Sequence, residues 1–528
     1  MNKYDAVIVG GGFAGIYMLY RAKKLGLKAK LLEAGDGAGG TWYWNRYPGA
    51  RCDIESMQYS YQFDDALQQE WEWSEKYASQ LEILKYVEHV IERYGLGCDM
   101  LFNTRVKSAE YDQSSNRWTT NTDRETYDSQ FCIMATGCLS SANMPDFKGK
   151  ELFKGPIYHT GEWPKDGVDF DGKKVGIIGT GSSAIQAIPI IAEQAKHLTI
   201  FQRTPNFSVP AQNEPLTSEK QKAVKADYNT FREFGKAQTL AYDINQNIKP
   251  GASLSDEEII EECENRWKLG ALNWYGAFSD ILVDQKTNDT VGDFVREKIK
   301  LKVKNPQVAE MLMPDSVFGC KRICADTNYY ETFNRKNVTL VDLRKKAIDT
   351  FSSQGIKVGD ERHNLDVIIS ATGFDAMTGS LNKIKIVGRD GLTLKDKWEA
   401  GPLTYLGLQS AGFPNLFIIS GPGSPSVLTC MITSIEQHVD FIGDAITHMK
   451  AKKAIAIEAT PEAENSWVSH VNEVAGSTLL NNCNSWYLGA NVPGKPRVFM
   501  PYIGFPAYAE KCRTVVANNY EGFSFDTV

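Results

Sequence analysis

Two glycine-rich stretches carry the residue types and spacing that bind dinucleotides. In the first, "YDAVIVGGGFAG", Gly10, Gly12 and Gly15 follow a short apolar run and open a helix-like one. Glu33 ends the next apolar run, "KAKLLEA", 23 positions after Gly10. Such glycines let the backbone approach a pyrophosphate at the positive end of a helix, and the acid accepts hydrogen bonds from ribose hydroxyls. This pattern predicts an FAD site.

The second stretch, "KKVGIIGTGSSAIQAIPIIAEQAKHLTIFQRTP", differs at the position that contacts the ribose. Gly179 and Gly181 form the turn, but the position 23 residues after Gly179 holds Gln202, and Arg203 follows it. A carboxylate there would repel a 2′-phosphate, whereas an arginine binds one through charge-assisted hydrogen bonds. We therefore expect NADPH at the second site. Two further predicted NADPH contacts open the second helix, Ser182 and Ser183.

These motifs belong to a chain of 528 residues, too long for one compact core. Apolar residues make up 42% and charged residues 23%, as in folded soluble proteins. The net charge of -7 argues against a nucleic-acid partner, because phosphate binding needs a basic face. There is no apolar run of the ~20 residues that a spanning helix needs, and the early strand "YDAVIVG" leads us to expect no signal peptide.

The ten cysteines are scattered along the sequence. The closest pair, Cys320 and Cys324, lacks the spacing of a metal site, so no metal is expected. We expect reduced, mostly buried thiols in a cytoplasmic, monomeric protein.

The order of the motifs predicts an α/β fold with two Rossmann-like dinucleotide-binding domains, for FAD and NADP, and a helical insertion. Strands ending in Ala-Thr-Gly, "FCIMATGC" and "DVIISATGFD", mark places where the chain could cross between the domains. We expect residues 1–140 and 375–528 to form the FAD-binding domain and residues 141–374 the NADP-binding domain. The insertion covers about 215–310, where "SLSDEEIIEE" has a capping box of Ser255 and Glu258.

A flavoprotein with two dinucleotide sites could be a disulfide reductase. That chemistry needs a cysteine pair soon after Glu33, packed against the flavin. The corresponding segment, "EAGDGAGGTWYWNRYPGARCDIES", has the single cysteine Cys52. The sequence therefore favours an oxidase or an oxygenase.

The stretch "FKGPIYHTGEWP", residues 153–164, is too irregular to predict a helix or a strand and must be a connection. It resembles the FxGxxxHxxxW fingerprint of the type I Baeyer–Villiger monooxygenases through Phe153, Gly155, His159 and Trp163. "GGTWYWNRYPGARCD" resembles a second signature of that family, and "GPGSPSVLTCM" is similar to a loop of its phenylacetone and cyclohexanone monooxygenase branch. The likeness covers essentially the whole chain.

The resemblance implies that NADPH reduces FAD, that dioxygen adds at the flavin C4a position and that the peroxide anion attacks a ketone. An ester or lactone results, and sulfides are further expected substrates. In "FGCKRICADTNYYETFNRKNV" the family's catalytic arginine falls on Arg322, and Asp53 matches the carboxylate that holds it. Residues implied to bind the nicotinamide cofactor are Lys321 and Thr204, beside Arg203, and Trp486. Residues implied to line the flavin are Gly40, Thr41, Trp42, Tyr59 and Met431.

His159 lies on the linker between domains, so we expect a structural or hinge role for it instead of catalysis. Together with Phe153, Trp163 and Pro164 it would form a stiff pivot on which the NADP domain swings.

Two other functions stay open. Related flavin monooxygenases that oxygenate amines and sulfides usually differ at the tryptophan of the fingerprint, so Trp163 and the Arg322/Asp53 pair favour the ketone reaction. A sensor that binds both cofactors without turnover is disfavoured because both sites and the pair are intact.

Overall fold

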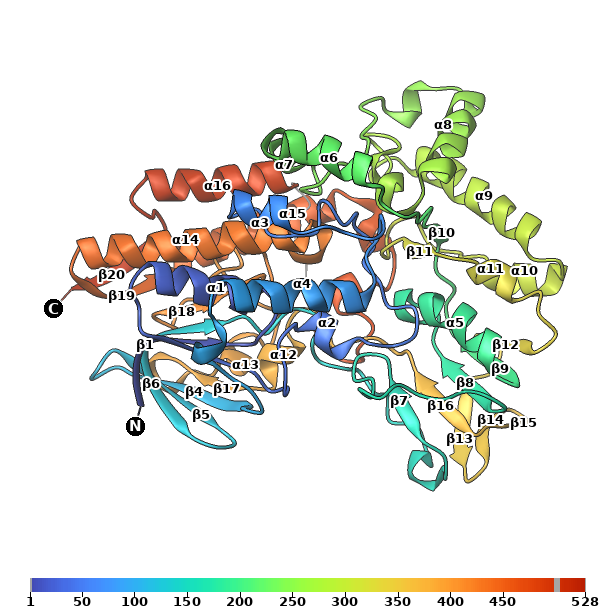
Figure 1. Cartoon of the computed structure of the whole chain (residues 1–528), viewed down its shortest axis with the longest axis horizontal. Helices are drawn as coiled ribbons and strands as arrows, with labels where there is room; N and C mark the ends of the chain where they lie inside the picture. The colour runs from blue at the N-terminus through green and yellow to red at the C-terminus, as the bar shows by residue number, and fades with distance from the viewer. Residues whose placement is uncertain (1, 498–503, 528) are drawn as a thin grey trace.

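The computed structural model describes residues 2–497 and 504–527. The chain forms two parts side by side, each built on its own sheet with parallel strands at its centre (Figure 1). A group of helices lies above the smaller part, and both termini lie at the far end of the larger one (Figure 1). The expected class, two dinucleotide-binding α/β units with a helical insertion, is confirmed.

The larger part contains the first glycine motif. Its central strands are apolar and buried because other strands pair with both of their edges and helices cover their faces. Helix α1 (Phe13–Lys24) packs against the long helix α14 (Met431–Ala451) above this sheet (Figure 1). The strand order is β17 (Lys385–Val387), β4 (Val106–Asp112), β5 (Arg117–Thr122), β6 (Thr126–Met134), β1 (Asn2–Val9), β2 (Ala29–Leu32) and β3 (Met100–Leu101), with β18 (Leu416–Ile418) also paired to β6.

The smaller part contains the second glycine motif, and all the neighbours in its sheet are parallel. Helix α5 (Ser182–Gln194) packs against this sheet through a separate apolar core. The strand order is β12 (Val338–Asp342), β9 (His197–Gln202), β8 (Lys174–Ile178), β16 (Val367–Ser370) and β7 (Ile157–His159). An antiparallel sheet of β13 (Ile348–Ser352), β14 (Gly355–Val358) and β15 (Glu361–Asn364) adjoins it.

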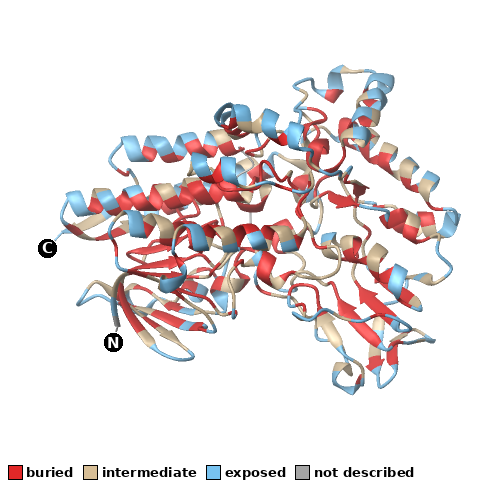
Figure 2. Cartoon of the chain, viewed as in Figure 1, coloured by how far each residue is buried: buried red, intermediate tan, exposed pale blue. Residues whose placement is uncertain are grey.

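Helices fill much of the chain between β10 (Ser208–Pro210) and β11 (Cys324–Asp326), which pair with each other. The expected capping box at Ser255 and Glu258 is confirmed. Burial in this region is one-sided, with exposed outer faces on α8 (Asp256–Leu269) and α9 (Gln285–Lys302) (Figure 2). The helices are α6 (Ser218–Ala226), α7 (Tyr228–Lys236), α8 (Asp256–Leu269), α9 (Gln285–Lys302) and α10 (Pro306–Leu312).

Two expectations from the sequence are wrong in part. The stretch 153–164 contains a strand, β7, because residues 157–159 pair in register with residues 368–370 at the edge of the smaller sheet. The cysteines are not all thiols: Cys320 and Cys483 form a disulfide. The other eight are free, and all of them except Cys98 are buried.

Residues 2–497 and 504–527 include no helix with the length and apolar character needed to cross a bilayer. The same residues hold no group of three or more His, Cys, Asp or Glu side chains that could bind a metal ion.

Candidate active site

The first glycine turn joins β1 to α1 and leaves no room for side chains. Gly10 has φ +111°, and a Cβ there would lie 2.5 Å from the Ala135 carbonyl oxygen. A Cβ on Gly15 would overlap the Gly10 carbonyl oxygen. The turn therefore requires glycine, and it brings α1 close against the end of β1.

Glu33 lies buried at the end of β2, beside this turn. Its Oε2 accepts the Gly11 N–H at 2.6 Å and its Oε1 accepts the Gly35 N–H at 2.7 Å, which fixes the carboxylate. Carboxylate oxygens have further lone pairs, and these can accept ribose hydroxyls. Gly12 caps α1 without any side-chain hydrogen bond, so the positive end of the helix is open to a pyrophosphate. These residues fit FAD.

The second turn repeats this geometry between β8 and α5. Gly179 has φ +108°, and a Cβ there would overlap the Ala371 carbonyl oxygen. Gly181 caps α5, again without a side-chain hydrogen bond, and faces open space. Ser182 and Ser183 are the first two residues of α5, and Ser183 Oγ lies 3.1 Å from Thr160 Oγ1.

Two cations lie together at the edge of the second turn. Arg203 follows β9 and is exposed, and Lys321 is partly buried. Burial and then the charge of Arg203 lower the pKa of Lys321. Such repulsion between two cations is relieved by an anion, so the residues fit a 2′-phosphate. Thr204, whose carbonyl accepts the Thr180 hydroxyl at 3.1 Å, is adjacent.

Arg322 and Asp53 meet in a two-fold hydrogen-bonded ion pair. Arg322 Nε donates to Asp53 Oδ2 at 2.6 Å and Nη2 donates to Oδ1 at 2.9 Å. A third bond runs from Nη1 to the Val427 carbonyl oxygen at 2.8 Å, so the guanidinium is fixed on two sides. Burial opposes the charge, but the attraction of Asp53 outweighs it and raises the pKa of Arg322 well above its usual value. The site thus holds a permanent, oriented cation.

The residues expected to line the flavin lie around the first turn. A Cβ on Gly40 would lie 2.8 Å from the Gly12 Cα, so this loop packs directly on the turn. Helix α2 (Thr41–Trp44) starts there, with Thr41 exposed and Trp42 buried. The indole of Trp42 donates to the Tyr59 hydroxyl at 3.1 Å. Met431 is the first residue of α14, and it packs against an apolar cluster that contains Val427. Trp486, the expected nicotinamide contact, packs against the same cluster.

The fingerprint stretch packs against the two connections between the parts. His159, in β7, lies edge-on to Phe374 with ring centres 6.0 Å apart, and its Nδ1 accepts the Gly161 N–H at 2.9 Å. Burial lowers the pKa of His159, so it is neutral at pH 7. The connections touch each other as well, since the Asn143 N–H donates to the Gly373 carbonyl at 2.9 Å.

The other three fingerprint residues are packing positions. Phe153 is buried in an apolar cluster under β13 and β14. A Cβ on Gly155 would overlap the Asp366 carbonyl oxygen. Trp163 is buried in the core of the smaller part, and its N–H donates to the carbonyl of Trp44 in the larger part at 3.4 Å.

Comparison with known proteins agrees with this arrangement. The family model described as pyridine nucleotide-disulphide oxidoreductase matches residues 7–244. The 2-oxo-Δ3-4,5,5-trimethylcyclopentenylacetyl-CoA monooxygenase of Pseudomonas putida is 42% identical over 98% of both chains. A Baeyer–Villiger monooxygenase of Pseudooceanicola batsensis is 39% identical over 98% of this chain and 95% of its own. The chain belongs to the Baeyer–Villiger monooxygenase family.

Two further relatives are a steroid monooxygenase and a phenazine N-monooxygenase. The solved structure of an oxidized steroid monooxygenase bound to NADP superimposes with a TM-score of 0.96, at 49% identity, and covers 100% of both chains. Phenazine N-monooxygenase of Lysobacter antibioticus is 38% identical over 98% of this chain and 96% of its own.

Three tyrosines around Arg322 in this Baeyer–Villiger monooxygenase were missed by the sequence reasoning. Tyr242, Tyr275 and Tyr487 all interact electrostatically with its guanidinium. Tyr242 and Tyr275 lie in the helical insertion, where no motif marks them, whereas Tyr487 directly follows the expected cofactor contact Trp486. Burial raises the pKa of each tyrosine, so all three hydroxyls stay protonated.

Proposed function

We propose that this protein is an NADPH- and O2-dependent flavoprotein monooxygenase that converts ketones to esters or lactones. The observation that carries the proposal is the Arg322–Asp53 pair, fixed by two hydrogen bonds to each other and one to Val427. Arg322 lies next in sequence to the 2′-phosphate candidate Lys321, and Val427 belongs to the glycine-containing loop before α14. Arg322 thus links the segment of the proposed 2′-phosphate site to a loop of the larger part.

Arg322 has the properties that the reaction needs. When bound, FAD activates dioxygen with electrons from NADPH. The ketone oxygen gains negative charge as its carbon is attacked, and a fixed guanidinium stabilises that charge. One such donor is worth about 3 kcal/mol in the transition state.

Asp53 keeps the donors of Arg322 oriented before the substrate arrives. It need not exchange a proton, because an arginine stays charged at any working pH. The buried Tyr242 and Tyr487 side chains shield part of Arg322 from water and leave its side chain 18% exposed, which strengthens the field of the guanidinium.

The rival activity is oxygenation of nitrogen or sulfur. The similarity to phenazine N-monooxygenase favours it. Oxygenation of such soft nucleophiles forms no oxyanion on the substrate, however. The fixed Arg322–Asp53 pair would then have no charge to stabilise in that reaction. We propose that ketones are the main substrates and that sulfides are oxidised as a secondary activity.

The test is a substrate panel with the FAD-loaded enzyme in air. A cyclic ketone should accelerate NADPH consumption and give a lactone with one added oxygen atom, identified by mass spectrometry. Product from a thioether or an amine alone would establish the rival activity. Cofactor binding with no substrate-dependent turnover on a broad ketone panel would establish a sensor.

We also propose that residues 1–140 and 375–528 form the FAD-binding domain, and 141–374 the NADP-binding domain with its insertion at about 215–310. Phe153, His159 and Trp163 would then act at the pivot between them. Replacing His159 by Ala should raise the NADPH consumed per product formed. An unchanged ratio of NADPH consumed to product formed in that variant would contradict the hinge role.

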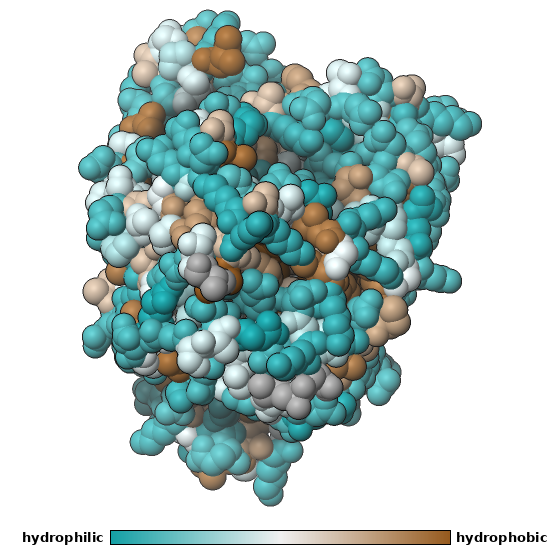
Figure 3. Space-filling view, turned by 90° about the vertical axis from the view of Figure 1, so that its left-hand side faces the viewer, coloured by the Kyte–Doolittle hydropathy of each residue, from teal (hydrophilic) through white to brown (hydrophobic). Residues whose placement is uncertain are grey.

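A cytoplasmic monomer is the final part of the proposal. The face in Figure 3 is mostly hydrophilic, with small scattered apolar patches and no broad one of the kind that forms obligate interfaces. Light scattering after gel filtration should give a mass near 58.9 kDa, and twice that value would show a dimer.

A further inference from the structure

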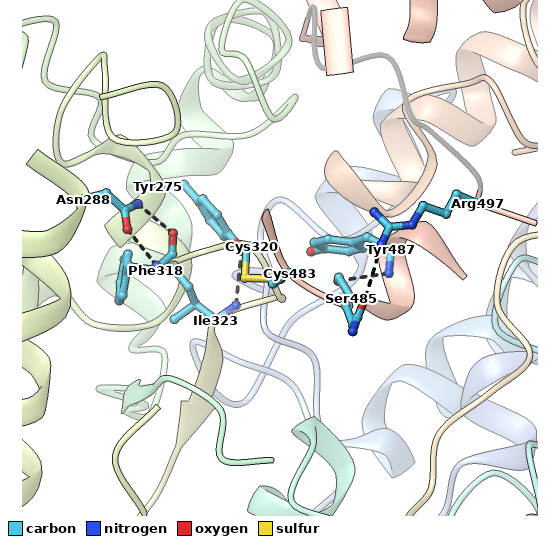
Figure 4. The surroundings of a disulfide bond; sticks show 10 residues. Tyr275, Asn288, Phe318, Cys320, Ile323, Cys483, Ser485, Tyr487 and Arg497 are labelled. Carbon is cyan, nitrogen blue, oxygen red and sulfur yellow. Dashed lines mark hydrogen bonds between the residues drawn. A yellow bond between two sulfur atoms is a disulfide. The ribbon is translucent and has the colours of Figure 1, made fainter. Parts of the chain in front are cut away.

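One covalent bond ties the neighbourhood of Arg322 to the C-terminal region. The disulfide joins Cys320 to Cys483, 163 residues later, with Cα atoms 6.3 Å apart. Cys320 precedes Arg322 by two residues, and Cys483 precedes Tyr487 by four. Figure 4 shows the disulfide between Tyr275 on one side and Ser485 and Tyr487 on the other. We call residues 483–497 the clasp.

The clasp has two further anchors, both on the connection that follows β16. Asn491 Nδ2 donates to the Phe374 carbonyl oxygen at 2.8 Å, and Lys495 pairs with Asp375. The clasp thus contacts the Arg322 segment at its start and the connection between the two parts near its end.

Tyr487 lies near the start of the clasp, and its side chain is buried in the protein interior. Its side chain belongs to an apolar cluster with Val427 and Met377 and is almost fully buried. Its backbone N–H donates to Ser485 Oγ at 3.1 Å, which fixes the turn that presents the ring (Figure 4).

Tyr487 packs with Val427, whose carbonyl oxygen accepts Arg322 Nη1 at 2.8 Å, so the Tyr487 ring lies behind the loop that holds the guanidinium. Tyr275 accepts the Ile323 N–H at 3.3 Å, so it is bound to the backbone beside Arg322. The guanidinium is therefore held by Asp53 and by the Val427 carbonyl, and Tyr487 supports the segment that carries this carbonyl.

We propose that Tyr487 is a positioning residue for Arg322 and that the Cys320–Cys483 disulfide holds it there, so that reduction of the disulfide loosens the contact. The inference rests on the proposed role of Arg322. Cys483 is partly exposed, so a small dithiol can reach it. The dithiol gives two electrons and two protons to the sulfur–sulfur bond, two cysteine thiols form, and the dithiol becomes a cyclic disulfide.

Reduction should loosen the start of the clasp without releasing all of it, because the Asn491 and Lys495 anchors do not depend on the disulfide. A disulfide limits how far apart the two residues that it joins can move, and reduction removes that limit. The expected change is therefore a more mobile Tyr487 and a less constrained Arg322 in a protein that is still folded.

The first test replaces Tyr487 by Leu, which removes the ring that packs with Val427 but keeps an apolar side chain. We expect about tenfold slower lactone formation, because the loop that holds Arg322 loses its support, with NADP+ affinity and FAD content unchanged. The NADPH consumed without product should rise. The matched control is Tyr111→Leu, which removes a buried tyrosine ring in the larger sheet. Equal lactone rates for Tyr487→Leu and this control would overturn the positioning role.

The second test does not depend on activity. Thiol titration of the unfolded protein should find eight thiols before treatment with dithiothreitol and ten after it. Amide hydrogen exchange at residues 486–495 should be at least about tenfold faster in the reduced protein and in a Cys320→Ser/Cys483→Ser variant, and dithiothreitol should not change that variant further. The control is Cys98→Ser, which removes an exposed free thiol: its hydrogen exchange should match that of the wild type, and its thiol counts should be one lower, seven before dithiothreitol and nine after it.

The possible failures are distinguishable. Ten thiols in the untreated protein, or unchanged exchange on reduction, would overturn the tether even if lactone is produced. If the serine variant does not fold, the reduced wild type carries the same comparison. A wild type that makes no lactone would overturn the proposed function, while the exchange experiment would still decide whether the disulfide holds the clasp.

Discussion

Replacing Asp53 by Asn probes the ion pair with the smallest change of shape. Asn keeps one acceptor for Arg322, but it replaces the second carboxylate oxygen by an amide group that donates. Of the two hydrogen bonds, at 2.6 and 2.9 Å, one is lost together with the negative charge.

The size of the effect follows from the strength of that bond. A hydrogen bond to a charged group contributes about 1.5–3 kcal/mol. The Arg322 and Asp53 side chains are 18% and 20% exposed, so water weakens the pair and a value of about 2 kcal/mol is appropriate. If Arg322 loses this much of its effect on the transition state, lactone formation slows about 30-fold. Removal of the cation in Arg322→Ala should cost more, about 100-fold or above.

The assay measures lactone by gas chromatography at saturating NADPH and ketone, alongside NADPH oxidation. The matched control is Asp128→Asn, which weakens a pair with Arg117 of similar exposure in the larger sheet. The control should lose stability but keep its lactone rate. Wild-type rates in both Asp53→Asn and Arg322→Ala would refute the reasoning, because neither the orientation nor the charge of Arg322 would then matter.

Three other substitutions test separate features. Glu33→Ala leaves the Gly11 and Gly35 N–H groups without their acceptor and removes the ribose contact, so FAD should bind at least about tenfold more weakly in a flavin fluorescence titration; unchanged affinity would contradict the assignment. Arg203→Ala and Lys321→Ala should each raise KM for NADPH about tenfold or more and leave KM for NADH unaltered, and equal changes for both cofactors would exclude a 2′-phosphate site. Burial raises the pKa of Glu436 to about 7, so its ionisation destabilises the fold increasingly from about pH 4.5 and fully above pH 7. Glu436→Gln should therefore be more stable than the wild type by about 3 kcal/mol at pH 8 and equally stable at pH 4.5, as measured by denaturant unfolding, and a gain that is the same at both pH values would show that ionisation is not its cause.

The geometry of the two glycine turns could be predicted from sequence because their parts are local. Gly10 and Glu33 belong to one strand–helix–strand unit, as do Gly179 and Arg203, and the spacing within such a unit is fixed by its geometry. The glycines are required because another backbone segment lies too close for a side chain, and the residue type alone is enough to indicate this.

The ion pair was accessible only through the family resemblance. Asp53 and Arg322 are 269 positions apart, and nothing in either segment specifies the other as its partner. The acceptor at Val427 is a backbone carbonyl, which any residue provides, so no residue type could reveal it. Tyr242 and Tyr275 come from an irregular region whose course depends on tertiary packing.

The disulfide and β7 were beyond sequence reasoning for related reasons. Cys320 and Cys483 are two of ten cysteines, and their approach depends on how the C-terminal region folds back. Strand β7 has three residues and forms because the edge of β16 is available for pairing. Its own residues therefore say little about whether it is a strand.

Two backbone connections between the smaller part and the larger one lie next to each other, at residues 143 and 372–373. Besides the Asn143–Gly373 hydrogen bond, the Thr372 hydroxyl donates to the Asn143 carbonyl at 2.5 Å. Two connections bonded in this way resist being pulled apart or sheared but can still twist. The Cys320–Cys483 disulfide is a further covalent link across the same boundary, so we expect any relative motion of the two parts to be a twist of limited size about the connections.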